Sequence, residues 1–87
     1  MAAKPIIITA HACFEMGRRR ITRADVEATI RAPGQVLPSP KRRHNYQSRV
    51  GPAGRMLLRV VLKEDSRTYH VIIVYKTRNV AKYWRTP

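Results

Sequence analysis

The sequence predicts an α+β fold with the element order β-α-α-β-β-β, in which two short helices pack on one face of an antiparallel sheet. Three observations support it: a short β-branched run near the start, two segments with helix-capping signals, and a two-residue alternation from His44 onward. With 87 residues the chain is too short for a second hydrophobic core, so we expect a single domain over residues 1–87.

The first strand is predicted at Pro5 to Thr9, because three consecutive isoleucines favour an extended backbone. Thr9 is a suitable N-cap residue, since its hydroxyl can accept from the first free backbone N–H groups of a helix. A short helix is therefore expected from Ala10 to Arg18.

The second helix is predicted from Arg23 to Arg31. Thr22 and Asp25 have the spacing of a capping box, and Ala32-Pro33-Gly34 ends the helical pattern. Val26 and Ile30 lie four residues apart and form the face that should meet the core.

The rest of the chain has the pattern of strands and tight turns. Gln35 to Leu37 is compatible with a further short strand, followed by a basic loop. Turn-forming tetrads at residues 51–54 and 64–67 separate three longer strands, and residues 76–87 form a tail. The longer strands are expected at residues 44–50, 55–63 and 68–75.

If four-residue loops join these strands, Arg59 lies opposite Tyr46 and Ile72. Alternation then divides the strand residues between two faces of the sheet. The helix-covered face would carry Met56, Leu58, Val60, Leu62, Val71 and Ile73. The opposite face would carry His44, Tyr46, Ser48, Arg59, Lys63, Thr68 and His70, with Leu57, Val61, Ile72 and Val74.

The charge of the chain indicates a polyanionic partner. Eighteen Lys and Arg residues against five Asp and Glu give a net charge of +13, and thirteen of the cations are arginine. Arginine makes bidentate contacts with phosphate and stacks on bases, so we expect nucleic-acid binding, with RNA favoured over DNA. Two basic runs, which contain Arg18, Arg19, Arg42 and Arg43, would follow phosphates without recognising a base sequence.

The single Cys13 cannot form an internal disulfide, and neither a signal-peptide pattern nor a membrane-spanning run is present. A cytoplasmic protein without membrane contact is expected. One cysteine and three widely spaced histidines predict no metal site, and no cofactor motif is found.

These residue types suit RNA cleavage by attack of the 2′-hydroxyl on the adjacent phosphate, which requires proton-transfer groups and cations but no metal. His11, His70, Tyr46 and Arg59 are the candidates within the predicted fold, each with an ordinary structural role as the alternative. In the tail, Lys82 lies beside Tyr83 and Trp84, whose rings either stack on a base or pack on the core.

Several of these residues also form a recognisable pattern. The opening Ile8-Thr9-Ala10-His11-Ala12, with Met16, Arg19 and Ile21-Thr22, resembles a bacterial family of unknown function whose opening is approximately ITxHAxxRMxxRxIT. The resemblance extends to the closing Lys82-Tyr83-Trp84. Such domains are similar to RelE-like toxins of the barnase–EndoU–colicin–RelE group of metal-independent ribonucleases.

The resemblance implies an endoribonuclease toxin that acts on RNA, including ribosome-bound messenger, and that pairs with an antitoxin protein. By position, His11 and Arg19 match the opening motif, and Lys82 and Tyr83 match the closing one, which adds Tyr83 to the candidate catalytic residues. Glu15 and Arg20 depart from the pattern, in which Arg and Gly are usual. A non-catalytic RNA- or DNA-binding module and a basic partner of an acidic protein remain the alternatives.

Overall fold

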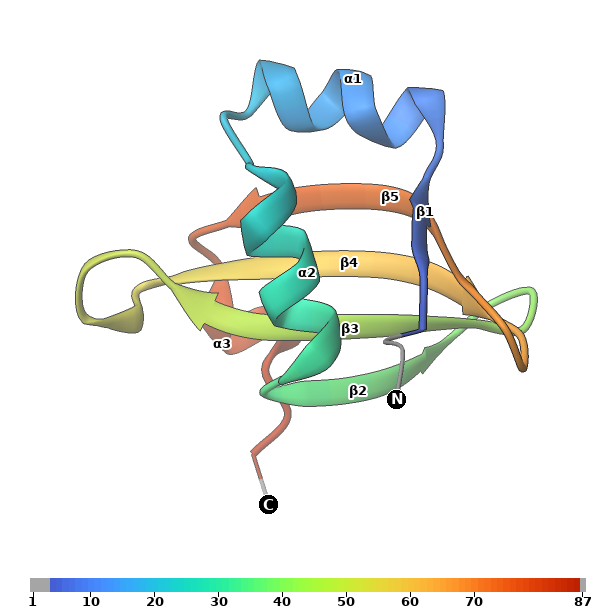
Figure 1. The fold of residues 1–87 in the computed structure, drawn as a ribbon. Coiled ribbons are helices and arrows are strands. Elements are labelled where there is room, and N and C mark those ends of the chain that lie inside the picture. The colour runs from blue at the N-terminus through green and yellow to red at the C-terminus, as the bar shows by residue number, and fades with distance from the viewer. Residues whose placement is uncertain (1–3, 87) are drawn as a thin grey trace.

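The computed structural model describes residues 4–86, which form a five-stranded mixed sheet with helices on both of its faces (Figure 1). The strand order in the sheet is β1-β5-β4-β3-β2. The elements in chain order are β1 (Ile6–Ile8), α1 (Ala10–Arg18), α2 (Arg23–Arg31), β2 (Gln35–Ser39), β3 (Arg43–Val50), the 3-10 turn η1 (Pro52–Gly54), β4 (Met56–Glu64), β5 (Tyr69–Thr77) and α3 (Val80–Tyr83).

The α+β class is confirmed, but the predicted sheet was too small and its strands were not all antiparallel. Gln35–Ser39 forms a full edge strand, β2, paired with β3. At the other edge β1 runs parallel to β5, where Ile7 pairs with His70. A third helix, α3, follows β5.

Both predicted helices have the predicted bounds, and their capping residues explain why they begin where they do. The Thr9 hydroxyl accepts a hydrogen bond from the Ala12 backbone N–H at 3.2 Å. Thr22 and Asp25 form a reciprocal capping box at the start of α2, so two free backbone donors are satisfied there.

The core lies between the sheet and the first two helices. In Figure 1 α2 crosses in front of β3 and β4, and α1 lies along β5. The buried side chains of this core come from β1, α1, α2, β4, β5 and the connection between the two helices. They are Ile6, Ala12, Met16, Ile21, Val26, Ile30, Leu58, Val60, Leu62, Val71 and Val74.

The predicted pairing of β3 with β4 was wrong by one residue. Val50 pairs with Met56 rather than with residue 55, because the connection through η1 is five residues long. Arg59 therefore pairs with Gln47 instead of Tyr46. A one-residue shift moves every side chain of a strand to the other face. His44, Tyr46 and Ser48 consequently lie on the helix-covered face.

The predicted pairing of β4 with β5 was wrong as well, since Arg59 pairs with Tyr75 instead of Ile72. Lys63 pairs with His70 rather than with Thr68, a shift of two residues that leaves the faces unchanged, and a β-bulge in β5 adds a third. Leu62 pairs with Val71 and Val61 pairs with Ile73, so Ile72 is the extra residue. Beyond the bulge the alternation is reversed: Val74 is in the core, and Ile73 is exposed on the opposite face. Leu57, Arg59, Val61, Lys63 and His70 lie on that opposite face, as predicted.

Candidate nucleic-acid interface

The sheet face turned away from α1 and α2, called the far face below, carries a polar cluster centred on Arg59. The Arg59 Nε donates to Gln47 Oε1 at 2.9 Å, and its Nη1 donates to the Tyr75 hydroxyl at 2.5 Å. The guanidinium carbon lies 4.1 Å from the ring centroid of Tyr83. Because Arg59, Gln47 and Tyr75 pair across three adjacent strands, the sheet itself fixes their spacing.

Gln47 fastens the C-terminal segment over this cluster. Its side chain is fully buried, and its Nε2 donates to Gln35 Oε1 at 2.7 Å and to the Tyr83 carbonyl at 3.2 Å. Gln35 Oε1 also accepts from the Arg85 backbone N–H, and Gln35 Nε2 donates to the Arg85 carbonyl. Two glutamines on the sheet therefore hold α3 and the residues after it in place.

Tyr75 and Tyr83 complete the cluster with their rings. The two rings meet edge to face, with centroids 6.4 Å apart. Lys82 lies with its Nζ 5.3 Å from the Tyr83 centroid, and the Arg49 guanidinium lies 5.6 Å from that of Trp84. Cations therefore lie next to aromatic rings around α3, an arrangement that attracts phosphates and offers ring faces to bases.

Of the candidate catalytic residues, the structure brings together Arg59 and Tyr83. His70 pairs with Lys63, four residues along β4 from Arg59, which corresponds to about 13 Å in an extended strand. His11 is the second residue of α1 and is exposed in the helix layer, with the sheet between it and Arg59. The histidines and Arg59 do not form one site.

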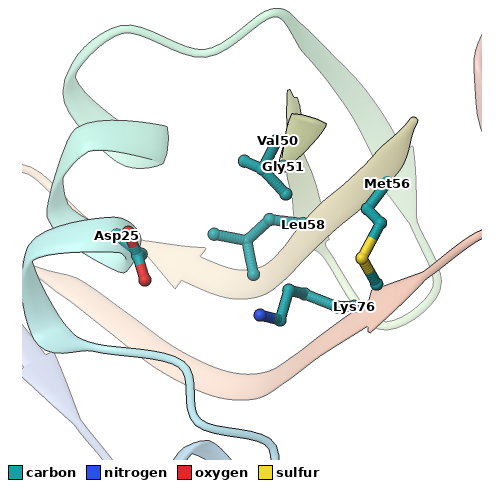
Figure 2. Close-up of a pocket in the computed structure, with 6 residues that line it drawn as sticks. All are labelled: Asp25, Val50, Gly51, Met56, Leu58 and Lys76. Carbon is teal, nitrogen blue, oxygen red and sulfur yellow. The ribbon is translucent and has the colours of Figure 1, made fainter. Parts of the chain in front are cut away.

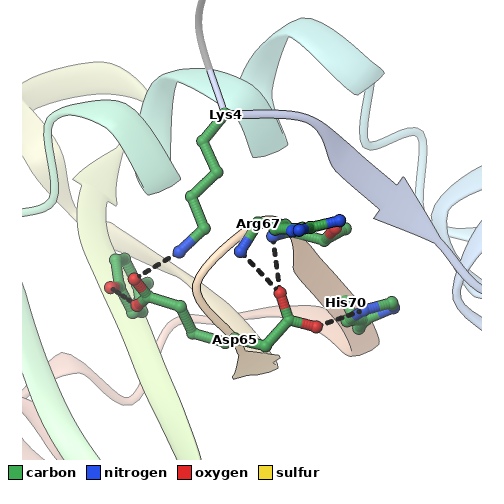
Figure 3. A network of polar contacts seen from close by, with 7 residues as sticks. Lys4, Asp65, Arg67 and His70 are labelled. Carbon is green, nitrogen blue, oxygen red and sulfur yellow. Dashed lines mark hydrogen bonds and ion pairs between the residues drawn. The ribbon is translucent and has the colours of Figure 1, made fainter.

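His70 instead belongs to a polar network at the β4–β5 turn, drawn in Figure 3. Its Nε2 lies 3.2 Å from Asp65 Oδ2, and the other oxygen of Asp65 accepts from the backbone N–H groups of Arg67 and Thr68. The Arg67 N–H is the main cause that lowers the pKa of Asp65. This network stabilises the turn.

Tyr46, predicted to contact nucleic acid, lies on the helix-covered face. Its hydroxyl donates to Glu64 Oε1 at 3.0 Å, and its ring meets Tyr69 edge to face. The pKa of Tyr46 is raised to about 12, mainly by burial and next by the hydrogen bond to Glu64. Glu64 also pairs with Lys4 at 2.8 Å, and this bond is the main cause that lowers the Glu64 pKa (Figure 3).

The other predicted nucleic-acid contacts are distributed over several surfaces. Arg18 and Arg19 pair with Glu15 at the end of α1, so Glu15 serves as their partner there. Arg42 is at an exposed hairpin turn with φ at +61°, a conformation rarely adopted by a residue with a side chain. Arg43 and Lys63 lie on the far face, near His70.

The ion pairs leave most of the positive charge free. Among the described residues, Arg20 and Arg31 in the helix layer and Lys41, Arg42 and Arg67 in turns form no ion pair, and the same holds for the cations of the far face. Each of the five acidic side chains has a partner within residues 4–86: Glu15, Asp25, Glu27, Glu64 and Asp65 bind groups on the helices, at the N-terminus of β1 or in the β4–β5 turn. Within residues 4–86, no ion pair is formed by the Lys and Arg side chains of the far face or by those near α3 and η1 at its end. These cations are Arg43, Arg49, Arg55, Arg59, Lys63, Arg78, Lys82 and Arg85.

Two hollows lie at the end of the sheet where β5 finishes. One, of about 380 Å³, is lined by Pro52, Arg55, Met56 and Arg78. The other, of about 150 Å³, lies beside the start of α2, and Figure 2 shows the Lys76 ammonium directed toward Asp25 across it. Within residues 4–86, no cluster of histidine, cysteine and acidic side chains could hold a metal ion, and no helix could span a membrane.

Sequence reasoning missed Gln35, Gln47 and Tyr75. The register error placed Gln47 on the wrong face, and a glutamine in a strand carries no signal of its own. A five-residue connection between β3 and β4 would have placed Gln47 opposite Arg59. A half-buried arginine requires acceptors, so this register would have identified Gln47 as one.

Residues 8–80 match the family described as Domain of unknown function (DUF4258), and the chain therefore belongs to that family. The expected membership of a small family of unknown function is confirmed. No curated protein and no solved structure matches the chain.

Proposed function

We propose that this protein binds single-stranded RNA through its phosphate backbone, along the far face and the basic end where α3 lies. The observation that supports this most is the charge of this surface: within residues 4–86 none of its Lys and Arg side chains is paired with a carboxylate. A surface with unpaired arginines attracts polyanions by releasing the counterions condensed on them. Single strands suit it because Tyr83 and Trp84 offer rings for stacking.

We further propose that RNA bound at Arg59 is cleaved without a metal, by attack of the 2′-hydroxyl on the adjacent phosphate. The Arg59 Nη2 atom makes no hydrogen bond within residues 4–86, so it is free to bind a phosphoryl oxygen that gains charge in the transition state. The ring of Tyr83 contacts the guanidinium, and its hydroxyl would serve as a proton donor or acceptor for the attacking or leaving oxygen.

The resemblance to RelE-like ribonucleases supports the same proposal. The chain has the element order β-α-α-β-β-β-β-α, which adds one strand and a closing helix to the β-α-α-β-β-β order of the resemblance. The shared part of this order and the closing Lys82 and Tyr83 are what carry the resemblance. If the resemblance extends to biology, this protein is the toxin of a toxin–antitoxin pair, and an acidic antitoxin would cover the same cations.

Binding without cleavage is the second candidate, favoured by a specific observation. Gln47, Tyr75 and Tyr83 already hold the Arg59 guanidinium, and both candidate histidines lie far from it. An arginine held in this way can serve mainly to dock α3. The chain would then bind RNA and leave it intact.

An RNA cleavage assay in EDTA distinguishes the two candidates. A ribonuclease yields products that end in a 2′,3′-cyclic phosphate, and we expect Tyr83→Phe to lower the rate at least about 100-fold. The variant keeps the ring that contacts Arg59, so its RNA affinity should change little. His11→Ala should leave the rate unchanged, whereas a site built around α1 would lose it. Intact RNA with wild-type protein would remove the ribonuclease proposal.

Salt dependence tests binding independently of cleavage. The affinity for a labelled single-stranded RNA should fall steeply from about 50 to about 200 mM salt, because each phosphate contact contributes about 0.7 to the slope of the logarithmic plot. Fluorescence anisotropy with a non-cleavable RNA measures it. An RNA affinity that did not change with salt concentration would contradict binding through the phosphates.

A further inference from the structure

The larger of the two hollows at the end of the sheet combines apolar side chains with arginines. It has a volume of about 380 Å³, and the residues that line it are Pro52, Arg55, Met56 and Arg78. Sites for small organic groups begin at about 300 Å³, so the hollow is large enough for one nucleotide.

Strand pairing and the η1 turn fix the positions of these residues. The paired part of β4 and β5 ends one residue from Met56 and one residue from Arg78, so these two residues are neighbours across the strands. Pro52 begins η1, and the Arg55 backbone N–H donates to the Pro52 carbonyl at 3.2 Å, which closes the turn. Figure 1 shows this connection extending past the end of the sheet. The two arginines therefore flank Met56, one along the chain and one across the strands.

The guanidiniums of this hollow have no partner among the described residues. Both side chains are exposed, and neither Arg55 nor Arg78 forms a side-chain hydrogen bond or an ion pair within residues 4–86. The smaller hollow differs, because the Lys76 ammonium there is directed toward the carboxylate of Asp25 (Figure 2). An anion is therefore attracted to the larger hollow, whereas a carboxylate opposes it in the smaller one.

We propose that this hollow binds the terminal nucleotide of an RNA that carries a phosphate at its end. The terminal phosphate lies between the guanidiniums of Arg55 and Arg78, and the base or the ribose packs on Met56 and Pro52. A phosphate at the 5′ end and one at the 3′ end share this chemistry. The subsite rests on the proposed RNA binding and adds to it recognition of a strand end.

Charge favours a terminal phosphate over the other anions. A phosphate monoester has three free oxygens and carries about −1.5 to −2 charges at pH 7, whereas a phosphodiester carries a single charge. An internal phosphate of the RNA can also reach the two arginines, but it gains less from them. Two planar guanidiniums offer more N–H donors than the two oxygens of a carboxylate can use, which disfavours an acidic peptide.

The first experiment compares three versions of one single-stranded RNA, with hydroxyl ends, with a 5′-phosphate and with a 3′-phosphate. The RNA carries 2′-O-methyl groups, which prevent cleavage, and an internal dye. Wild-type protein should bind at least one phosphorylated version about tenfold more tightly than the hydroxyl version by fluorescence anisotropy. Arg55→Gln with Arg78→Gln should bind all three with equal affinity. Lys63→Gln should weaken all three by the same factor and keep the tenfold ratio.

A second experiment locates the phosphate in the hollow. In protein with ¹³C-labelled methionine methyl groups, adenosine monophosphate should shift the NMR signal of the Met56 methyl group, and adenosine should shift it much less. Met56→Leu assigns the signal, and the methyl group of Met16, which is buried in the core, should not respond. The Arg55/Arg78 variant should lose the response. A Met56 signal that adenosine monophosphate leaves unchanged would overturn the subsite.

The outcomes separate the subsite from the proposed function. Equal affinities of wild-type protein for the three RNAs, or a preference that persists in the Arg55/Arg78 variant, would overturn the subsite and leave RNA binding intact. If wild-type protein binds none of the three RNAs, the proposed function itself fails, and the subsite with it. Urea denaturation verifies that the double variant folds, and the two single variants test the same ratio if it does not.

Discussion

Arg59 is stabilised by side chains from three different elements. Gln47 on β3 and Tyr75 on β5 accept its hydrogen bonds, and Tyr83 on α3 covers its guanidinium. An arginine within an apolar strand would otherwise lose hydration without compensation. The same contacts order α3, so the charge that we propose binds phosphate also determines where the tail lies.

On the helix-covered face, the raised pKa of Tyr46 makes the stability of the fold depend on pH in the alkaline range. Its pKa is raised to about 12 in the folded protein, against about 10 in an unfolded chain. A raised folded pKa means that the stabilisation is complete below about pH 10 and is lost as the pH rises toward about 12. Tyr46→Phe should be about 1 kcal/mol less stable at pH 7, because it lacks the bond to Glu64.

Urea denaturation at several pH values checks this prediction. Between about pH 10 and about pH 12 the urea concentration at the unfolding midpoint of the wild type should decrease. The midpoint of Tyr46→Phe should decrease less over the same pH interval. Tyr75→Phe is the control, since it removes a tyrosine hydroxyl on the far face. Equal alkaline losses in wild type and Tyr46→Phe would show that other groups cause the loss.

At the scale of single residues, the sequence identified Arg59 and Tyr83 but not what connects them. A charge between apolar residues is visible in a sequence, and so is an aromatic next to a lysine. The partners Gln47 and Tyr75 depend on strand register. The length of the β3–β4 connection fixes it for Gln47, and the β4–β5 connection with its bulge fixes it for Tyr75.

Among the elements, those with local signals were predicted well. Both long helices were correct in their bounds, because Thr9 and Thr22 cap them through neighbouring residues. The parallel pairing of β1 with β5 joins residues that are far apart in the sequence. The bulge at Ile72 interrupts the alternation of β5. Neither feature leaves a local pattern in the sequence.

The docking of α3 depends on close contact at Gly34. A Cβ at that position would lie 2.9 Å from the Trp84 ring, so Gly34→Ala should displace Trp84 from the sheet. We expect about 1–3 kcal/mol of destabilisation and a shift of Trp84 fluorescence to longer wavelength, as the ring becomes hydrated. Trp84 is the only tryptophan of the chain, so its emission reports on this contact alone.

Gly17→Ala is the matched control for that substitution. A Cβ at Gly17 meets no atom within 4 Å, and alanine favours a helix over glycine by about 0.5–1 kcal/mol. The control should therefore stabilise the protein without changing Trp84 emission. If Gly34→Ala left both stability and emission unchanged, α3 would not be docked as described.

For the whole molecule, the net charge of +13 predicts a conflict between stability and binding. Arg55 and Arg78 line the same hollow and form no ion pair within residues 4–86, so at low salt they repel neighbouring cations. Replacing both with glutamine should stabilise the free protein by about 0.5 kcal/mol at low salt, a gain that screening removes at high salt.

The same double variant should bind RNA less tightly. The loss of two phosphate contacts would lower the salt slope by about 1.4. Anisotropy titrations across salt concentrations measure the slope, and urea denaturation of the free protein measures stability. Arg23→Gln with Arg31→Gln removes equal charge from α2, on the other side of the sheet, where the Arg23 and Arg31 guanidiniums donate to the backbone. This control should lose stability and keep the slope. Equal slopes for wild type and the Arg55/Arg78 variant would place the RNA elsewhere on the molecule.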